Sequence, residues 1–241
     1  MNGATRLRLG TRASALARWQ ADWVAGQLQQ RGIDVELVLI ATQGDVQSGP
    51  IGTIGAQGVF TKEIQRALLD HRIDLAVHSL KDLPTDPIDG LALAAVPPRE
   101  RAGDALVSNR VTEFAALGPH ARVGTGSMRR RAQLLHVRPD LQVLTIRGNV
   151  DTRLRQLDEG RYDAIVLAEA GLTRLGLTDR ITQVLPKEWM LPAIGQGALG
   201  LETRADDQQT RALVALLDEP ATHAAVDAER ALLAALHGGC L

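Results

Sequence analysis

Apolar and polar residues follow two periods along the first hundred residues, and the pattern predicts alternating strands and helices. A strand is expected over residues 5–10, and an amphipathic helix over 14–31 ends at Gly32. The chain returns as the strand VELVLIAT. After a glycine-rich loop over 43–58, a helix over 61–71 leads to the buried strands DLAVHS and LALAAV. Repeated strand–helix–strand winding predicts a largely parallel sheet with both faces covered.

The pattern starts again after Pro97 and Pro98. The polar connection PPRERAGD is followed by DALVS, RVGTGS, a helix, LQVLTIRG, another helix and YDAIVLA. LGLETR is typical of a strand that returns to the first lobe, with helices over 206–217 and 222–237 after it. We therefore predict an α/β fold with two doubly wound lobes and a hinge. Domain 1 is expected to comprise residues 1–97 and 198–217, and domain 2 residues 98–197.

Composition restricts the classes of function. The net charge is −1 and aromatic residues make up 2% of the chain, which argues against nucleic-acid binding. No apolar run resembles a signal peptide or a membrane span, so a cytoplasmic protein without a membrane partner is expected. The lone Cys240 cannot form an intramolecular disulfide, and no spacing predicts a metal site. Cys240 is either an inert small hydrophobe or a reactive thiol.

Arginine dominates the basic residues, because only three of the 27 are lysines. Arginine can hold a carboxylate or phosphate through two parallel hydrogen bonds, although a GC-rich genome also raises its frequency. Three strand-to-helix junctions combine arginines with small residues, and helix N-termini bind anions: RLGTRAS, GTGSMRR and RGNVDTR. Arg129 and Arg130 are unfavourable in a first helical turn unless an anion compensates them. The alternative is that these arginines are solvated or paired with surface acids.

HSLKDLP places Lys81 and Asp82 just after a buried strand, where open α/β sheets bind ligands. Asp82 is either an acid facing the arginines or a turn residue before Pro84.

His78 is interpreted as a core histidine. GQGALG, residues 195–200, matches a dinucleotide-binding pattern, but the strand-like LGLETR follows where that motif requires a helix, so we reject the match.

Seven segments in order resemble the porphobilinogen deaminase family, also called hydroxymethylbilane synthases: RLGTRAS, VFTKEIQRALL, DLAVHSLKDLP, VGTGSMRR, IRGNVDTRL, LPAIGQGALGLE and the terminal HGGC. The resemblance implies a periplasmic-binding-protein-like fold and a monomeric transferase of tetrapyrrole biosynthesis. That enzyme joins four porphobilinogen molecules head to tail, with loss of ammonia, on a covalent dipyrromethane cofactor. Family members usually add a third, α+β domain. Here residues 218–241 are expected to be its start, with most of it absent.

The resemblance also implies roles for individual residues. Cys240 would carry the cofactor through a thioether, and Asp82 would stabilise the cation formed when ammonia leaves. The remaining matches would hold pyrrole carboxylates or donate hydrogen bonds to them: Arg8, Arg12, Ser14, Ser79, Lys81, Thr125, Ser127, Arg129, Arg130, Arg147, Arg153 and Arg174. The chain departs from the family at Gln43, Thr53 and Gln57, where basic residues are common, and at Asp151, where glycine is frequent.

Two other functions are compatible with the arginine pattern. A non-catalytic two-lobed module that binds or senses an organic anion needs the same arginines but neither Asp82 nor Cys240. An enzyme acting on a phosphorylated metabolite would also use arginines at helix N-termini. Competition by inorganic phosphate in a binding assay separates the second function from the other two.

Overall fold

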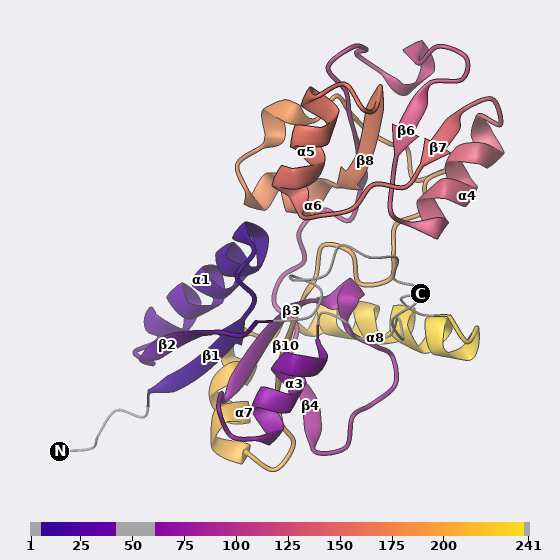
Figure 1. The fold of residues 1–241 in the computed structure, drawn as a ribbon. Coiled ribbons are helices and arrows are strands. Elements are labelled where there is room, and N and C mark those ends of the chain that lie inside the picture. The colour runs from indigo at the N-terminus through magenta and orange to yellow at the C-terminus, as the bar shows by residue number, and fades with distance from the viewer. Residues whose placement is uncertain (1–5, 42–60, 239–241) are drawn as a thin grey trace. The chain divides into compact units, whose positions relative to one another are not determined.

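The computed structural model describes residues 6–41 and 61–238 and divides into two compact units (Figure 1). Unit 1 comprises residues 1–100 and 198–241, and unit 2 comprises residues 101–197. No helix within the described ranges has the length and apolar character needed to cross a membrane. Each unit contains its own sheet and its own cores, so the expectation of two α/β lobes is confirmed.

The sheet of unit 1 has the order β2-β1-β3-β10-β4. Its strands are β1 (Leu7–Thr11), β2 (Val35–Leu39), β3 (Leu75–Ser79), β4 (Leu91–Ala95) and β10 (Leu199–Arg204). β1 pairs in parallel with β2 and β3, whereas β10 lies antiparallel between β3 and β4. The prediction that LGLETR joins the first sheet is confirmed. The expectation of a largely parallel sheet holds only for one half of it.

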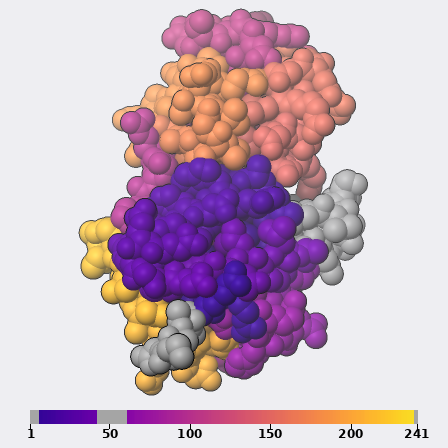
Figure 2. All heavy atoms as spheres, turned by 90° about the vertical axis from the view of Figure 1, so that its left-hand side faces the viewer, coloured from indigo at the N-terminus to yellow at the C-terminus, as the bar shows by residue number. Residues whose placement is uncertain are grey.

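Helices cover both faces of this sheet. The helical segments are α1 (Ala15–Gln29), α3 (Lys62–Leu69), α7 (Gln208–Val214), α8 (Pro220–Ala235) and the 3-10 turns η2 (Leu80–Asp82) and η5 (Ala215–Leu217). Val24 and Leu28 of α1 pack with Leu9 on one face, while Ile64 and Leu68 of α3 belong to a separate core. Figure 2 shows the side of unit 1 that residues 6–41, in indigo, cover.

The sheet of unit 2 has the order β7-β6-β8-β5-β9. The strands are β5 (Asp104–Val107), β6 (Arg122–Gly124), β7 (Gln142–Leu144), β8 (Ala164–Ala168) and β9 (Gln183–Val184). Its helices are α4 (Met128–Val137), α5 (Val150–Asp158) and α6 (Glu169–Arg174), with 3-10 turns η3 (Phe114–Ala116) and η4 (Thr178–Arg180). Leu134 of α4 and Leu154 of α5 belong to different cores. The sheet is again mixed, because β5 runs antiparallel to β8 and β9.

Residues 218–238 are grouped with unit 1. Glu219 caps α8 by accepting hydrogen bonds from the backbone of Ala221 and Thr222, and Pro220 fits the first helical turn. Val226 is buried in a small core with Leu80. The domain limits at 97 and 217, and the start of a third domain at 218, stay predictions.

Asp74 connects three strands of the first sheet. It precedes β3, and its Oδ1 accepts hydrogen bonds from Nη2 of Arg8 on β1 at 2.8 Å and from Nη2 of Arg204 on β10 at 3.0 Å. Its Oδ2 accepts a hydrogen bond from Nε of Arg8 at 2.9 Å. Partial burial opposes ionisation, but the hydrogen bonds from the two arginines outweigh it and lower the pKa of Asp74 to about 2.

We expect Asp74→Asn to lower the free energy of unfolding by about 2 kcal/mol at pH 7, since a pKa near 2 when folded and near 3.9 when unfolded is equivalent to that much stability. The folded-state pKa is depressed, so the contribution is complete above about pH 5 and is lost as the pH falls toward 2. Urea unfolding of both proteins at pH 7 and pH 3 measures the difference. Asp70→Asn, which removes a largely exposed carboxylate, is the control. A wild-type advantage independent of pH over this range would contradict the assignment.

Candidate active site

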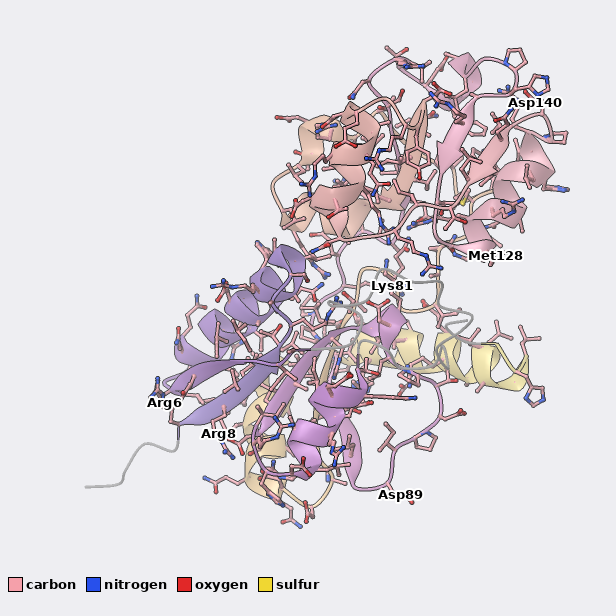
Figure 3. The ribbon with its side chains drawn as sticks, viewed as in Figure 1. Arg6, Arg8, Lys81, Asp89, Met128 and Asp140 are labelled. Atoms are coloured by element: carbon pink, nitrogen blue, oxygen red, sulfur yellow. The ribbon has the colours of Figure 1, made fainter. Side chains whose placement is uncertain are left out.

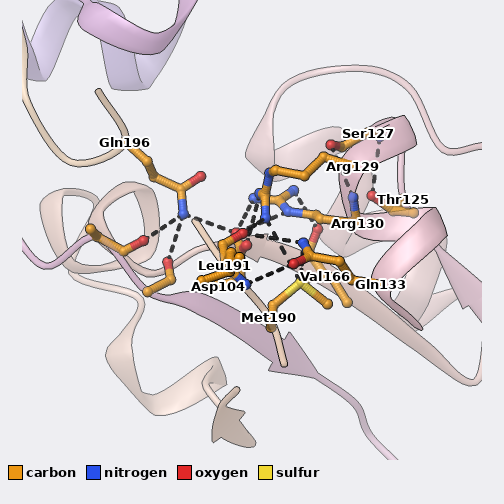
Figure 4. A network of polar contacts seen from close by, with 12 residues as sticks. Asp104, Thr125, Ser127, Arg129, Arg130, Gln133, Val166, Met190, Leu191 and Gln196 are labelled. Carbon is orange, nitrogen blue, oxygen red and sulfur yellow. Dashed lines mark hydrogen bonds and ion pairs between the residues drawn. The ribbon is translucent and has the colours of Figure 1, made fainter. Parts of the chain in front are cut away.

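A buried carboxylate binds two neighbouring arginines of unit 2, Arg129 and Arg130 (Figure 4). Asp104, the first residue of β5, is fully buried, and its Oδ1 accepts hydrogen bonds from Nε and Nη2 of Arg130 at 2.9 and 2.6 Å. Nη1 of Arg130 donates to the carbonyl of Val166 at 2.9 Å. Arg130 is therefore bound within the protein. Arg130 is thus paired with an acidic side chain of the protein itself, although this acid is buried and not on the surface.

Arg129 lies on the other side of the same carboxylate. Its Nη2 forms an ion pair with Oδ2 of Asp104 at 2.8 Å. Nη1 of Arg129 donates to the carbonyl of Leu191, while its Nε is buried without a hydrogen-bond partner. Two guanidinium groups thus surround one carboxylate. The cluster has one surplus positive charge and an unused donor.

The pKa values follow from this balance of charges. Burial alone would raise the pKa of Asp104, but the charges of Arg130 and Arg129 outweigh it and hold the pKa below its ordinary value. Burial is also the largest cause of the lowered pKa of Arg129, and the charge of Arg130 adds to it, with partial compensation by Asp104. An anion bound near Arg129 would offset its repulsion by Arg130, so the charges of the cluster favour binding of an anion.

Local geometry fixes the start of α4, which carries both arginines. Ser127 caps the helix by accepting a 3.4 Å hydrogen bond from the backbone N–H of Arg130, and Oγ1 of Thr125 accepts one from the N–H of Ser127 at 3.2 Å. Gly126 is required because a Cβ there would lie 2.9 Å from the carbonyl oxygen of Ile146. Thr125 and Ser127, expected as ligand donors, thus both serve as acceptors within this turn.

Gln196 is a buried polar residue of this site that no sequence motif indicated. Its Nε2 donates to Asp104 Oδ1 at 3.0 Å and to the carbonyl of Ala102 at 2.6 Å. It lies in the turn of GQGALG, and the strand β10 begins at Leu199. The rejection of a dinucleotide motif is therefore confirmed. The sequence feature that could have indicated Asp104 is its position as the one charged residue of the apolar strand DALVS.

The other arginines of unit 2 differ in how they are engaged. Arg147 precedes α5 and has an exposed side chain. Arg153 on α5 donates through Nε to the carbonyl of Gly148 at 2.7 Å. Arg174 on α6 is buried and donates through Nη2 to the carbonyl of Gly197 at 2.7 Å. Arg147 is thus the most accessible of the predicted ligands of this unit, and Arg174 has a structural contact.

In unit 1 the predicted residues other than Arg8 lie at the carboxyl ends of β1 and β3. β1 and β3 are neighbouring parallel strands, so the segments that follow them lie at the same end. Ser14 caps α1 by accepting from the N–H of Ala17 at 3.4 Å, and Ser79 accepts a 2.9 Å hydrogen bond from Gln20. Arg12 lies between β1 and α1, whereas Lys81 and Asp82 form part of η2 after β3.

Asp82 is half-buried, and no hydrogen bond or ion pair joins its side chain to another residue of the ranges 6–41 and 61–238. Turn formation at η2 comes instead from the backbone, through a 3.1 Å hydrogen bond from the N–H of Leu83 to the carbonyl of Leu80. The carboxylate is therefore not consumed by capping the turn before Pro84.

The structure does not place Arg8 with these residues. Arg8 is near the beginning of β1, at the opposite end from Arg12, and its guanidinium is bound by Asp74. Figure 3 shows Arg8 and Lys81 at different ends of unit 1. The assignment of Arg8 as a ligand residue stays a prediction.

Several predicted positions lie outside the described residues. These are the cofactor position Cys240 and the loop positions Gln43, Thr53 and Gln57. Among the described residues, no group of three or more His, Cys, Asp and Glu side chains could hold a metal ion. Asp151, the remaining departure from the family pattern, is exposed in the first turn of α5, where an acid suits the helix dipole.

Comparison with known sequences gives one consistent result. A family model described as "Porphobilinogen deaminase, dipyromethane cofactor binding domain" matches residues 7–212. The porphobilinogen deaminase of Geobacter sulfurreducens is 54% identical over 238 residues, which cover 98% of this chain and 74% of the relative. Those of Trichlorobacter lovleyi and Chlorobium chlorochromatii are 53% and 48% identical, each over 98% of this chain and 76% of the relative.

Solved structures of similar fold include two binding proteins. The methionine binding protein MetQ matches with a TM-score of 0.57 and 14% identity over 94% of this chain and 95% of its own. A periplasmic substrate-binding protein of an ABC transporter from Coxiella burnetii matches with a TM-score of 0.53 and 17% identity, over 92% and 96%. At such identities these structures show the fold alone, which agrees with the expected periplasmic-binding-protein-like architecture.

The different engagement of two arginines gives a direct test. Arg130→Leu should lower the free energy of unfolding by about 3–5 kcal/mol, because it removes the main partner of a buried carboxylate. Arg147→Leu should change it by less than about 0.5 kcal/mol, because that side chain is exposed. Urea denaturation of protein purified without added ligand measures both. Equal effects of the two substitutions would contradict this division between structural and accessible arginines.

Proposed function

The chain belongs to the porphobilinogen deaminase family, and we propose that its arginine-bearing sheet edges bind the acetate and propionate groups of porphobilinogen and of the dipyrromethane cofactor, with Asp82 as the catalytic group. Enzymes of this family are transferases of tetrapyrrole biosynthesis, known also as hydroxymethylbilane synthases. Four porphobilinogen molecules are joined head to tail. Each condensation breaks the C–N bond of an aminomethyl group, releases ammonia, and forms a C–C bond with loss of a ring proton.

The observation that carries the binding proposal is the charge balance around Asp104. One carboxylate is surrounded by two guanidinium groups, and Nε of Arg129 has no hydrogen-bond partner. The uncompensated charge and the unused donor fit a carboxylate-rich ligand such as a linked pair of pyrroles. The cofactor supplies the pyrrole carbon to which the first unit is joined. Arg129, Arg147 and Arg153 are the proposed carboxylate ligands in this unit, with Arg130 and Arg174 supporting them.

In unit 1 the proposed ligand-binding residues are Arg12, Ser14, Ser79 and Lys81, and the proposed catalytic residue is Asp82. The loss of ammonia generates positive charge on the pyrrole, and a fixed carboxylate stabilises such charge in the transition state. The absence of an internal partner for Asp82 among the described residues supports this role, because a carboxylate already neutralised by arginine would contribute little. Lys81 would bind the substrate's carboxylates beside it.

The competing functions receive less support. A sensor or solute-binding module would need the fold and the arginines, but the family model and the relatives of 48–54% identity are all described as porphobilinogen deaminases. An enzyme for a phosphorylated metabolite has no corresponding relative among these matches. A monomeric state and a cytoplasmic location are proposed from the family resemblance. Light scattering of the purified protein tests the first of these.

Cys240 is proposed to carry the cofactor through a thioether, and the intact mass of the protein tests this. We expect denatured wild-type protein to retain the mass of a dipyrromethane and to give the colour reaction of linked pyrroles with an acidic aldehyde reagent. Cys240→Ser should show the unmodified mass and no formation of hydroxymethylbilane. An active Cys240→Ser variant would overturn the carrier role. Unmodified wild-type protein would show that the chain is isolated without its cofactor.

Asp82→Asn should retain the covalent cofactor and lose about a hundredfold or more of the turnover, because the amide keeps the shape and removes the charge. Initial rates of porphobilinogen consumption, on protein whose loading has been checked by mass, measure the effect. The matched control is Asp86→Asn, an exposed aspartate four residues later. Near-normal turnover in Asp82→Asn would assign the catalytic role elsewhere.

A further inference from the structure

The backbone that carries Asp82 is held at both ends by hydrogen bonds. On the β3 side, the N–H of Leu80 donates to the carbonyl of Ala198 at 3.0 Å. On the far side, η2 ends where Leu83 and Pro84 leave the turn, and Pro84 has no N–H of its own. The orientation of the Asp82 carboxylate therefore depends on what fixes residues 83 and 84.

A single arginine of α8 contacts these two residues. Nη1 of Arg230 donates to the carbonyl of Leu83 at 3.1 Å, and Nη2 donates to the carbonyl of Pro84 at 2.6 Å. Val226 lies one helical turn earlier and is completely buried in a core that includes Leu80 and Leu83. Figure 1 shows α8 beneath the turn after β3. One face of α8 thus holds the Asp82 turn through an apolar contact and a bidentate polar contact.

The placement of this arginine is costly if its only purpose is packing. Burial lowers the pKa of Arg230, with partial compensation by the charges of Asp227 and Glu202. Oε1 of Glu202 accepts a hydrogen bond from Nε2 of Gln65 at 3.1 Å, and its Oε2 is hydrogen-bonded to Nε2 of His78 at 3.1 Å. An apolar side chain of similar length would fill the same space without the desolvation of a charge. Such a side chain could not donate hydrogen bonds to two consecutive carbonyl groups, as Arg230 does.

Attachment of α8 does not depend on Arg230 alone. Nη2 of Arg99 donates to Oε2 of Glu229 at 3.1 Å, and Glu219 caps the N-terminus of the helix. Neither contact involves residues 80–84. Replacing Arg230 should therefore release residues 83 and 84 while α8 stays in place.

We propose that Arg230 is a positioning residue: its guanidinium fixes the backbone after Asp82 and so holds the catalytic carboxylate in its working orientation. The part of this inference that concerns catalysis rests on the proposed role of Asp82. The part that concerns the turn rests only on the contacts of Arg230 with Leu83 and Pro84.

Hydrogen–deuterium exchange of the full chain tests the turn without any need for activity. In Arg230→Met, the peptide covering residues 78–84 should exchange about tenfold faster, since two charge-assisted hydrogen bonds are lost. Arg230→Lys should be intermediate, because an ammonium group cannot span both carbonyls as the planar fork does. The matched control is Arg211→Met on α7, where Nη1 donates to the carbonyl of Ala205 at 2.9 Å on the exposed surface. It should leave this peptide unchanged.

Turnover tests the catalytic part. In protein with its cofactor loading checked by mass, Arg230→Met should lower kcat about tenfold with KM within about twofold, and Arg230→Lys should restore part of kcat. Unchanged exchange in both Arg230 variants would overturn the proposal, as would faster exchange with unchanged kcat. If Arg230→Met does not fold, as judged by near-UV circular dichroism, Arg230→Lys decides by the same criteria. Wild-type protein without turnover would refute the proposed function, while exchange would still decide whether Arg230 holds the turn.

Discussion

The carboxylate of Asp104 is buried where water cannot compensate its charge, and the arrangement of unit 2 depends on how that charge is balanced. Arg130 provides two hydrogen bonds and Arg129 a second positive charge, so the start of α4, the start of β5 and the turn at Gln196 all converge on one group. The balance is uneven by one positive charge. A fold with that imbalance is compatible with an anionic ligand and would be less favourable without one.

The same chemistry serves a different purpose in unit 1. Asp74 also binds two arginines. There the hydrogen bonds connect three strands at the end of the sheet opposite to the proposed site. The number of arginines in the sequence therefore does not give the number that bind a ligand. Arg8, Arg130 and Arg204 are held by internal carboxylates, whereas Arg147 has an exposed side chain. The distinction depends on which arginines have an aspartate within reach, which is a property of the fold.

Local pattern predicted the elements well where the period was clear. The helix expected over 14–31 is α1 (Ala15–Gln29), and LGLETR is the strand β10 (Leu199–Arg204). The pattern did not predict that β5 and β10 run antiparallel to their neighbours, because direction is set by the path of the chain between strands. The contact of Asp104 with Arg130 spans 26 residues and two elements, so no spacing rule could reveal it. The contact of Arg8 with Asp74 spans 66 residues and was hidden for the same reason.

α8 relates two parts of the proposed mechanism that are far apart in sequence. It ends at Ala235, five residues before Cys240, and its inner face holds the turn that carries Asp82. The helix that precedes the proposed carrier residue is thereby fixed within the same unit as the proposed catalytic carboxylate. Val226 and Arg230 make these contacts one turn apart, so a rotation of α8 about its axis would break both together. In this proposal the orientation of Asp82 therefore depends on the position of α8, a helix more than a hundred residues later in the sequence.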